Sequence, residues 1–237
     1  MKYIFSIVIL LGFSFSLSAA DYYINDGVTG EGSAICSAVG NNTNNGTTTS
    51  TPKATLANIF STYNLAAGDI IHVDVGTYSE SSTTIGSNDE GFTIQGVSEA
   101  LTLFDGANVT TFFIKIENAG NDDITFKNLT IKNYGTTAAN GSGKAIFIGG
   151  TVSGIAITGT IISNVTFDDI DCNNANESFG GAIAYGSYAG GSGVTINNCT
   201  FLNNDSGSGA CYTSAAGTGD AITINFNDCI FHTNSSA

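Results

Sequence analysis

Few residues of this sequence could carry acid–base chemistry, and they fall on two short stretches in which apolar and polar residues alternate. Elimination from a uronate requires a base at C5 and a cation that stabilises the developing negative charge, whereas glycoside hydrolysis requires two carboxyl groups about 5–10 Å apart. The candidate catalytic cluster consists of His72, Asp74, Lys115 and Glu117. Asp74 and Lys115 would be lateral neighbours, and the competing interpretation is an exposed ion pair without a chemical role.

A second group of candidate residues is acidic. Asp168, Asp169 and Asp171 lie close together in the sequence, with Glu177 and Asp205 one repeat further on. Carboxylate oxygens clustered in this way could hold Ca²⁺. The spacing matches neither an EF-hand nor a Gly-Asp repeat, so a solvated acidic turn is the alternative interpretation. No other feature of the sequence requires a cofactor.

Aromatic residues suggest a surface for ligand contact. If the central apolar residue of each alternating stretch points into the core, the residue directly after it points outward. This register predicts an outward column formed by Asp74, Lys115, Phe147, Ala184 and Tyr212. Ligand sites combine aromatic side chains with a few placed polar groups. We therefore expect Phe147 and Tyr212 to stack on sugars, with Asp74 and Lys115 supplying polar contacts.

A repeat must position these residues. Four eight-residue segments align without gaps, beginning at Ile124, Thr160, Val194 and Ile224, and the Asn or Asp at their fifth position recurs at spacings of 36, 34 and 30 residues. A weaker copy covers residues 92–96 and 101–106. Strict alternation indicates strands, and a period of about 20–50 residues is typical of a solenoid.

The repeats predict an all-β parallel β-helix of about five three-strand rungs, stacked about 4.8 Å apart. The stretch 71–75 is expected to share the third strand position with residues 113–116, 145–148, 181–185 and 210–213. Two columns point into the core: Leu129, Val165, Cys199 and Cys229, and Ile131, Phe167, Phe201 and Phe231. The column of Asn128, Asn164, Asn198 and Asp228 marks a sharp bend, because Asn and Asp tolerate the left-handed conformation.

The cysteines fit this arrangement. The chain has five, so at least one is unpaired. Cys199 and Cys229 share an inward column and are expected to form a buried stack of thiols. Cys36 and Cys172 are the better candidates for a bridge, although the sequence does not pair them with each other.

Composition excludes one class of partner. The chain has 20 acidic residues against six lysines and no arginine, which gives a formal net charge of −14. Because nucleic-acid binding depends on cations that neutralise phosphates, a nucleic-acid partner is not expected. Thirty glycines and a single proline agree with many short strands joined by turns.

The sequence predicts three parts. Residues 1–20 read as a secretory signal cut after Ala20, because Lys2 precedes a short apolar run that ends in small residues. No later apolar run is long enough for a membrane span. Residues 21–69 form an N-terminal loop and capping segment, with a helix expected from Pro52 to about Tyr63. Residues 70–237 form the β-helix, which stops in mid-turn and is expected to be truncated at its C-terminus.

The repeats resemble right-handed parallel β-helix proteins of the pectate-lyase-like superfamily. The segment Gly180-Gly-Ala-Ile183, together with Phe-x-x-Asn at Phe201–Asn204 and Phe231–Asn234, is similar to the repeat of chlamydial polymorphic outer-membrane proteins. This resemblance covers roughly residues 51–237 and implies a right-handed coil. Lyases of this superfamily use Arg as the base, and this chain has none.

Together these features predict a protein that is secreted or held at the cell surface and that acts in adhesion or glycan binding without catalysis. The expected partner is an extracellular polysaccharide or a host or cell-surface glycan. The alternative is a polysaccharide lyase or glycoside hydrolase that uses the candidate catalytic cluster of His72, Asp74, Lys115 and Glu117. An ice-binding solenoid would need regular rows of threonines, and the rows starting at Thr125 and Thr130 are each broken by one repeat.

Overall fold

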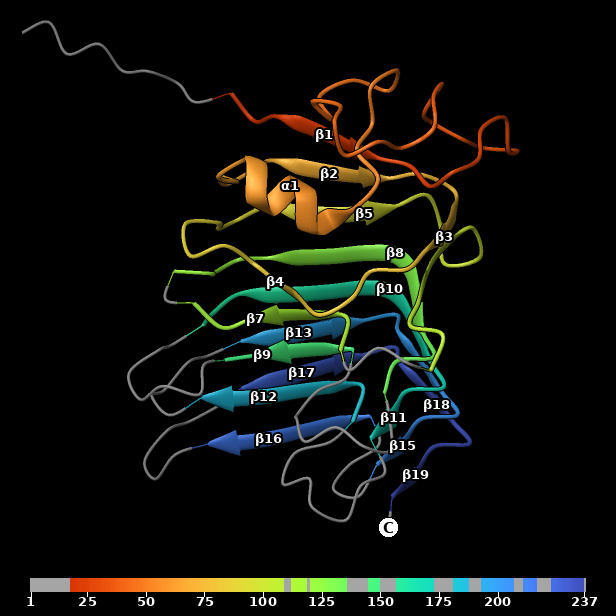
Figure 1. Cartoon of the computed structure of the whole chain (residues 1–237). Helices are drawn as coiled ribbons and strands as arrows, with labels where there is room; N and C mark the ends of the chain where they lie inside the picture. The colour runs from red at the N-terminus through yellow and green to blue at the C-terminus, as the bar shows by residue number, and fades with distance from the viewer. Residues whose placement is uncertain are drawn as a thin grey trace, which may run out of the picture.

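The computed structural model describes the chain in nine stretches, and the fold is all-β with a single helix in these residues. The described residues are 18–108, 112–118, 120–135, 145–149, 157–172, 181–187, 193–206, 211–216 and 223–236. All of the strand pairings are parallel, and the strands stack into layers, as Figure 1 shows. This arrangement is consistent with a β-solenoid. None of the helical residues described forms a segment long and apolar enough to cross a membrane.

The largest layer is an eleven-stranded sheet, here called the long sheet. Its main path consists of β1 (Asp21–Ile24), β2 (Ile70–Val73), β5 (Thr93–Gly96), β8 (Thr125–Lys132), β10 (Thr160–Asp168), β13 (Val194–Asn197) and β17 (Ile224–Asn227). Four further strands continue it beyond the bend: β3 (Gly76–Tyr78), β6 (Thr102–Asp105), β14 (Thr200–Leu202) and β18 (Ile230–His232).

Two smaller sheets complete the stack. The short sheet contains β4 (Thr83–Thr84), β7 (Ile114–Ile116), β9 (Ile146–Ile148), β12 (Ile183–Ser187) and β16 (Tyr212–Ala216). A three-stranded sheet contains β11 (Asp171–Cys172), β15 (Asp205–Ser206) and β19 (Ser235–Ser236). From residue 124 onward, neighbouring strands of each sheet come from successive copies of the sequence repeat.

The observed register confirms the gapless alignment of the repeats. Ile161 pairs with both Thr125 and Thr195, and Thr195 pairs in turn with Asn225. The predicted bend is also present, since the backbone is left-handed at all four positions of the column, with φ of +59° at Asn128, +52° at Asn164, +51° at Asn198 and +53° at Asp228. The side chains stack as well, and Asn164 Nδ2 donates to Asn128 Oδ1 at 3.1 Å.

The interior is filled by the predicted apolar columns. The rings of Phe167, Phe201 and Phe231 stack at successive centroid distances of 5.0 Å, and the first two are fully buried. The Phe-x-x-Asn pattern has a physical role, because Asn204 lies inside the bend that follows Phe201. Its Nδ2 donates to Phe167 O at 3.1 Å and to Asn234 Oδ1 at 2.9 Å. Cys36, Cys199, Cys211 and Cys229 are free thiols, so the expectation that Cys36 forms a bridge is wrong.

Two expectations about the first part of the chain need correction. The stretch 71–75 does not lie in the short sheet, because β2 pairs with β1 and β5 in the long sheet. The position next to β7 is taken instead by the two-residue strand β4. The helix α1 covers only Leu56–Thr62 and starts later than predicted, because Thr55 is its N-cap and accepts from Asn58 N.

Candidate functional site

The structure divides the predicted catalytic cluster between two regions of the protein. His72 lies on β2 in the long sheet, whereas Lys115 lies on β7 in the short sheet. The residue opposite Lys115 is Thr84 on β4, not Asp74. The prediction that Asp74 and Lys115 are lateral neighbours is therefore wrong, and no pair of candidate acid and base is formed across these two sheets.

Asp74 points into the protein and not outward. Its side chain is fully buried and accepts three backbone hydrogen bonds, from the N–H groups of Ile35, Cys36 and Val75, at 2.7–2.8 Å. The strand ends at Val73, so the alternation that would direct Asp74 outward no longer applies. Asp74 is thus a structural acceptor that holds the loop around Ile35.

Lys115 and Glu117 remain together on the short sheet. Lys115 Nζ lies 4.0 Å from Glu117 Oε2, and both side chains are 30% exposed. Nζ also lies 4.5 Å from the ring centroid of Phe112 and 5.7 Å from that of Phe147. The two ring contacts are cation–π interactions. The ammonium group of Lys115 is thus surrounded by one carboxylate and two aromatic rings.

The predicted aromatic contacts change in detail. Phe147 does follow Lys115 in the outward column, but only 7% of its surface is exposed, so it offers little area for stacking on a ligand. Tyr212 pairs with Ile183, and it is Thr213 that lies opposite Ala184. The predicted register was therefore off by one residue at Tyr212, whose side chain lies outside the described part of the structure.

The acidic residues proposed for Ca²⁺ do not converge. Asp168 Oδ1 accepts from Asn203 Nδ2 at 3.1 Å, and Asp169 is at a left-handed bend, with φ of +54°. Asp171 lies on β11, where it pairs with Asp205. The residues that the structure describes contain no group of three His, Cys, Asp or Glu side chains that could hold a metal ion. Glu177 lies outside those residues.

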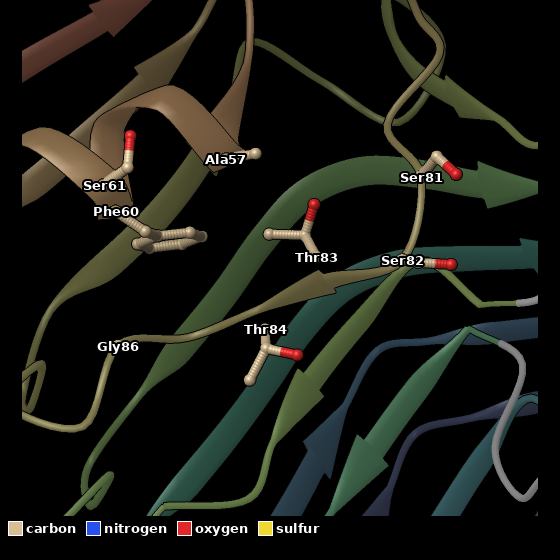
Figure 2. A pocket seen from close by; sticks show the side chains of 8 residues that line it. All are labelled: Ala57, Phe60, Ser61, Ser81, Ser82, Thr83, Thr84 and Gly86. Carbon is tan, nitrogen blue, oxygen red and sulfur yellow. The ribbon is translucent and has the colours of Figure 1, made fainter.

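A pocket of about 250 Å³ lies between α1 and the segment that contains β4. Its lining is made of small hydroxyl side chains and one aromatic ring: Ser61, Ser81, Ser82, Thr83, Thr84 and Phe60, with Ala57 and Gly86. In Figure 2, the ring of Phe60 on the helix faces Thr83 across this space. The hydroxyls of Ser81 and Thr84 have no partner within the part of the protein that the structure describes.

Burial and hydrogen bonding fix the geometry of this pocket. Glu80 is 3% exposed, accepts from the N–H of Leu56 and accepts from Thr83 Oγ1 at 3.3 Å. Burial raises the pKa of Glu80, although the hydrogen bonds from the helix backbone and Thr83 act in the opposite direction. Tyr134 Oη donates to Glu80 O at 2.8 Å. Glu80 thus attaches the start of α1 to the hydroxyl segment and keeps both walls of the pocket in place.

The sequence patterns do not predict this pocket. The only local signal is the run of four hydroxyl residues from Ser81 to Thr84, and this run has no copy in the later repeats. Thr84 also connects the pocket to the predicted ligand face, since it lies beside Lys115 in the short sheet. The two features form one surface, here called the hydroxyl face, which consists of the pocket together with Lys115 and Glu117.

Comparisons of the chain with known protein families, with curated proteins and with solved structures give no match.

Proposed function

We propose that this chain is an exported, surface-associated right-handed parallel β-helix that binds a glycan and does not turn it over. In this proposal the stack consists of about five three-strand rungs, the helix α1 covers its N-terminal end, and the resemblance to pectate-lyase-like and polymorphic outer-membrane repeats reflects a common fold. The partner is an extracellular polysaccharide or a cell-surface glycan.

The observation that carries the proposal is the pocket of the hydroxyl face. Its walls present several hydroxyl groups that can both donate and accept hydrogen bonds, beside the half-buried ring of Phe60. Sugar hydroxyls require this pairing of donors and acceptors, and an aromatic ring suits the apolar faces of a sugar. The volume of about 250 Å³ suits a single sugar residue of a longer chain.

Binding in preference to catalysis is favoured by the placement of the titratable groups. Lys115 is next to Glu117, and the other acids of this region, Glu80 and Asp89, are buried as acceptors of backbone hydrogen bonds. Acids that are buried and accept backbone hydrogen bonds are poorly placed to act as the second carboxyl group that hydrolysis needs. The proposal includes no cofactor, so removal of Ca²⁺ with EDTA should leave binding unchanged.

Blocking the pocket tests the proposal. Thr84 is exposed, so Thr84→Tyr should fold and fill the pocket, whereas Thr77→Tyr places the same ring on an exposed position of β3. On a glycan array, Thr84→Tyr should lose at least about tenfold in affinity, corresponding to about 1.4 kcal/mol, and Thr77→Tyr should retain binding. Equal binding by both variants would overturn the proposal.

A parallel assay addresses the alternative enzyme function. The protein is incubated with acidic and neutral polysaccharides, with and without Ca²⁺, and the products are followed as unsaturated uronates and as new reducing ends. Neither product should form. Turnover that disappears in Lys115→Ala would establish a lyase or hydrolase in place of a binding protein.

A further inference from the structure

A second cavity lies on the outer surface of the long sheet, away from the hydroxyl face. Its volume is about 240 Å³, and its lining consists of Ile35, His72, Gln95, Gly96 and Val97. His72 and Gln95 are adjacent in register on β2 and β5, so their side chains are neighbours on the outer surface. We propose that this cavity is a second sugar-binding site, which takes one neutral hexose residue through hydrogen bonds to His72 and Gln95.

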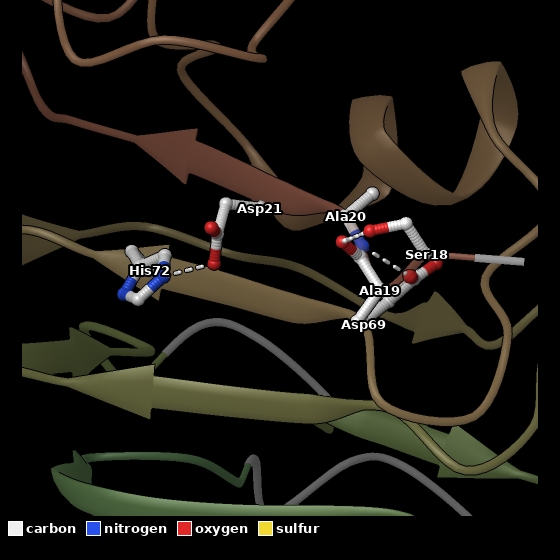
Figure 3. A network of polar contacts seen from close by, with 6 residues as sticks. All are labelled: Ser18, Ala19, Ala20, Asp21, Asp69 and His72. Atoms are coloured by element: carbon white, nitrogen blue, oxygen red, sulfur yellow. Dashed lines mark hydrogen bonds and ion pairs between the residues drawn. The ribbon is translucent and has the colours of Figure 1, made fainter.

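The imidazole of His72 is held in one orientation. Its Nε2 lies 2.7 Å from Asp21 Oδ1, and this contact is drawn as a dashed line in Figure 3. The imidazole ring also stacks on Tyr23, with a centroid distance of 5.0 Å and an interplanar angle of 16°. With Asp21 accepting from Nε2–H, the neutral imidazole has Nδ1 as a hydrogen-bond acceptor. A ring fixed in this way loses little conformational freedom when it binds a ligand.

The floor of the cavity offers hydrogen bonds that the protein does not use. His72 Nδ1 and the side-chain amide of Gln95 have no partner among the residues that the structure describes. Together they provide two acceptors and the two N–H donors of an amide. Neighbouring hydroxyl groups of a sugar, each of which donates and accepts, match this set.

The two apolar walls are fixed by buried polar groups. Asp74 accepts from Ile35 N at 2.7 Å, and Thr102 Oγ1 accepts from Val97 N at 2.9 Å and donates to Asp74 O at 3.1 Å. Asp74 and Thr102 are both fully buried. Thr102 is linked to Asp74 through the backbone carbonyl of Asp74, so two connected buried residues hold both walls.

The backbone position next to Val97, residue 96, accepts only glycine. A Cβ at position 96 would lie 2.2 Å from Asn128 O and 2.8 Å from Thr102 Cβ, so only Gly fits there. Ile35 is 41% exposed, and its apolar surface therefore faces solvent beside the polar floor. Apolar walls around a few fixed polar groups are typical of small-molecule sites, and they suit the C–H faces of a sugar.

The charges around the cavity favour a neutral ligand over an acidic sugar. Asp21 lies against His72, and the chain carries a net charge of −14, both of which oppose an anion. Lys127 is the nearest cation in register, beyond Gln95 on β8, and it does not line the cavity. Uronates should therefore bind more weakly than neutral hexoses.

Saturation-transfer NMR with methyl glycosides of neutral hexoses and of uronic acids tests this site. His72→Ala and Gln95→Ala should each weaken neutral-hexose binding about threefold to tenfold, the loss expected for one hydrogen bond. Lys127→Ala is the control beside the cavity and should bind as the wild type does. Val97→Trp should fill the cavity and abolish this signal, which keeps the test valid if His72→Ala folds poorly.

The same titrations in Thr84→Tyr separate this site from the pocket between α1 and β4. Binding that persists in Thr84→Tyr and is lost in Gln95→Ala and Val97→Trp supports the second site, even if the first pocket binds nothing. Three results would overturn it: no neutral glycoside binds, the affinity is unchanged in Gln95→Ala and Val97→Trp, or the methyl uronosides bind more tightly than the neutral glycosides.

Discussion

The two ends of the long sheet use polar groups in different ways. Near β1 and β2, four carboxylates are buried and accept backbone hydrogen bonds from loops or from the start of α1: Asp69, Asp74, Glu80 and Asp89. Beyond residue 100, the buried polar side chains that the structure describes are Asn, Thr and Ser. Around β13, β14, β17 and β18, amide groups of successive repeats bond to one another, as Asn227 Nδ2 does to Asn197 Oδ1 at 2.8 Å.

The difference between the two ends of the long sheet follows from the sequence repeat, which is present at one end only. In a repeated segment, each backbone group pairs with the strand before and after it, and identical side chains form ladders that satisfy one another. The loops between residues 25 and 69 have no copies to pair with, so their N–H groups need individual acceptors. A carboxylate accepts several hydrogen bonds and is suited to this role. The ends also differ in exposure, since Phe226, Ile230 and Phe231 on β17 and β18 are 40–60% exposed.

The largest predicted effect compares two members of one aromatic column. Phe201 is fully buried between two rings, and Phe201→Ala should lower the free energy of unfolding by about 3–5 kcal/mol. Phe231 is 52% exposed, so Phe231→Ala should cost about 1 kcal/mol. Urea denaturation monitored by circular dichroism measures both. Equal losses would show that the exposed end is covered in solution.

The next prediction compares Asn204 with Asn234, which lie in the same two repeats as Phe201 and Phe231. Asn204 is fully buried, accepts from Ile170 N at 3.1 Å and donates to Phe167 O. Asn204→Leu leaves these groups without partners and should cost about 1–3 kcal/mol. Asn234 accepts from Asn204 Nδ2 and donates to Phe201 O, but it is partly exposed, so Asn234→Leu should cost less than Asn204→Leu. A larger cost at Asn234 would contradict the difference between the interior and the edge.

The third prediction tests the buried carboxylates through pH. Because burial raises the pKa of Glu80, its contribution to stability is complete below the pKa of the unfolded chain and is lost as the pH rises through the raised folded value. Glu80→Gln removes this dependence. The stability of Glu80→Gln relative to the wild type should therefore increase as the pH rises from about 4 toward 8, as followed by thermal denaturation. A difference that stays constant with pH would contradict the raised pKa.

The repeated part of the fold could be predicted because its signal recurs. The left-handed bends at Asn128, Asn164 and Asn198 and the stacked Phe167 and Phe201 each follow from a column that is visible in the sequence. Each position is supported by its copies, so an error in one repeat would conflict with the others. The parallel pairing of successive copies follows directly.

The candidate site could not be predicted in the same way, because it belongs to the part without copies. Alternation assigned residues 71–75 to a strand with the correct inward face, but it does not say which sheet a strand joins. Thr83 and Thr84 show no apolar alternation, yet they occupy the position beside Lys115. Asp74 was misplaced because the acceptor role of its side chain depends on Ile35 and Cys36, about 40 residues away.

The smallest predicted effect has the opposite sign from that of Glu80. Burial alone would raise the pKa of Asp105 on β6, but hydrogen bonds from Asn133 Nδ2 at 2.9 Å, Ala107 N at 2.8 Å and Lys132 outweigh burial and lower that pKa. Its contribution to stability is therefore present above the pKa of the unfolded chain and is lost as the pH falls through the lowered folded value.

Asp105→Asn should accordingly cost less than about 1 kcal/mol near neutral pH, and this cost should shrink as the pH falls below about 4. Thermal denaturation of both proteins across that range measures the trend. Added salt should reduce the part of this cost that depends on Lys132, because the ion pair between Asp105 and Lys132 is partly exposed. If the pH trend of Asp105→Asn has the same sign as that of Glu80→Gln, acids in the repeats and acids at the irregular end experience the same environment. In that case, the contrast between carboxylates that replace missing strand partners and carboxylates that join a ladder of repeated side chains would not hold.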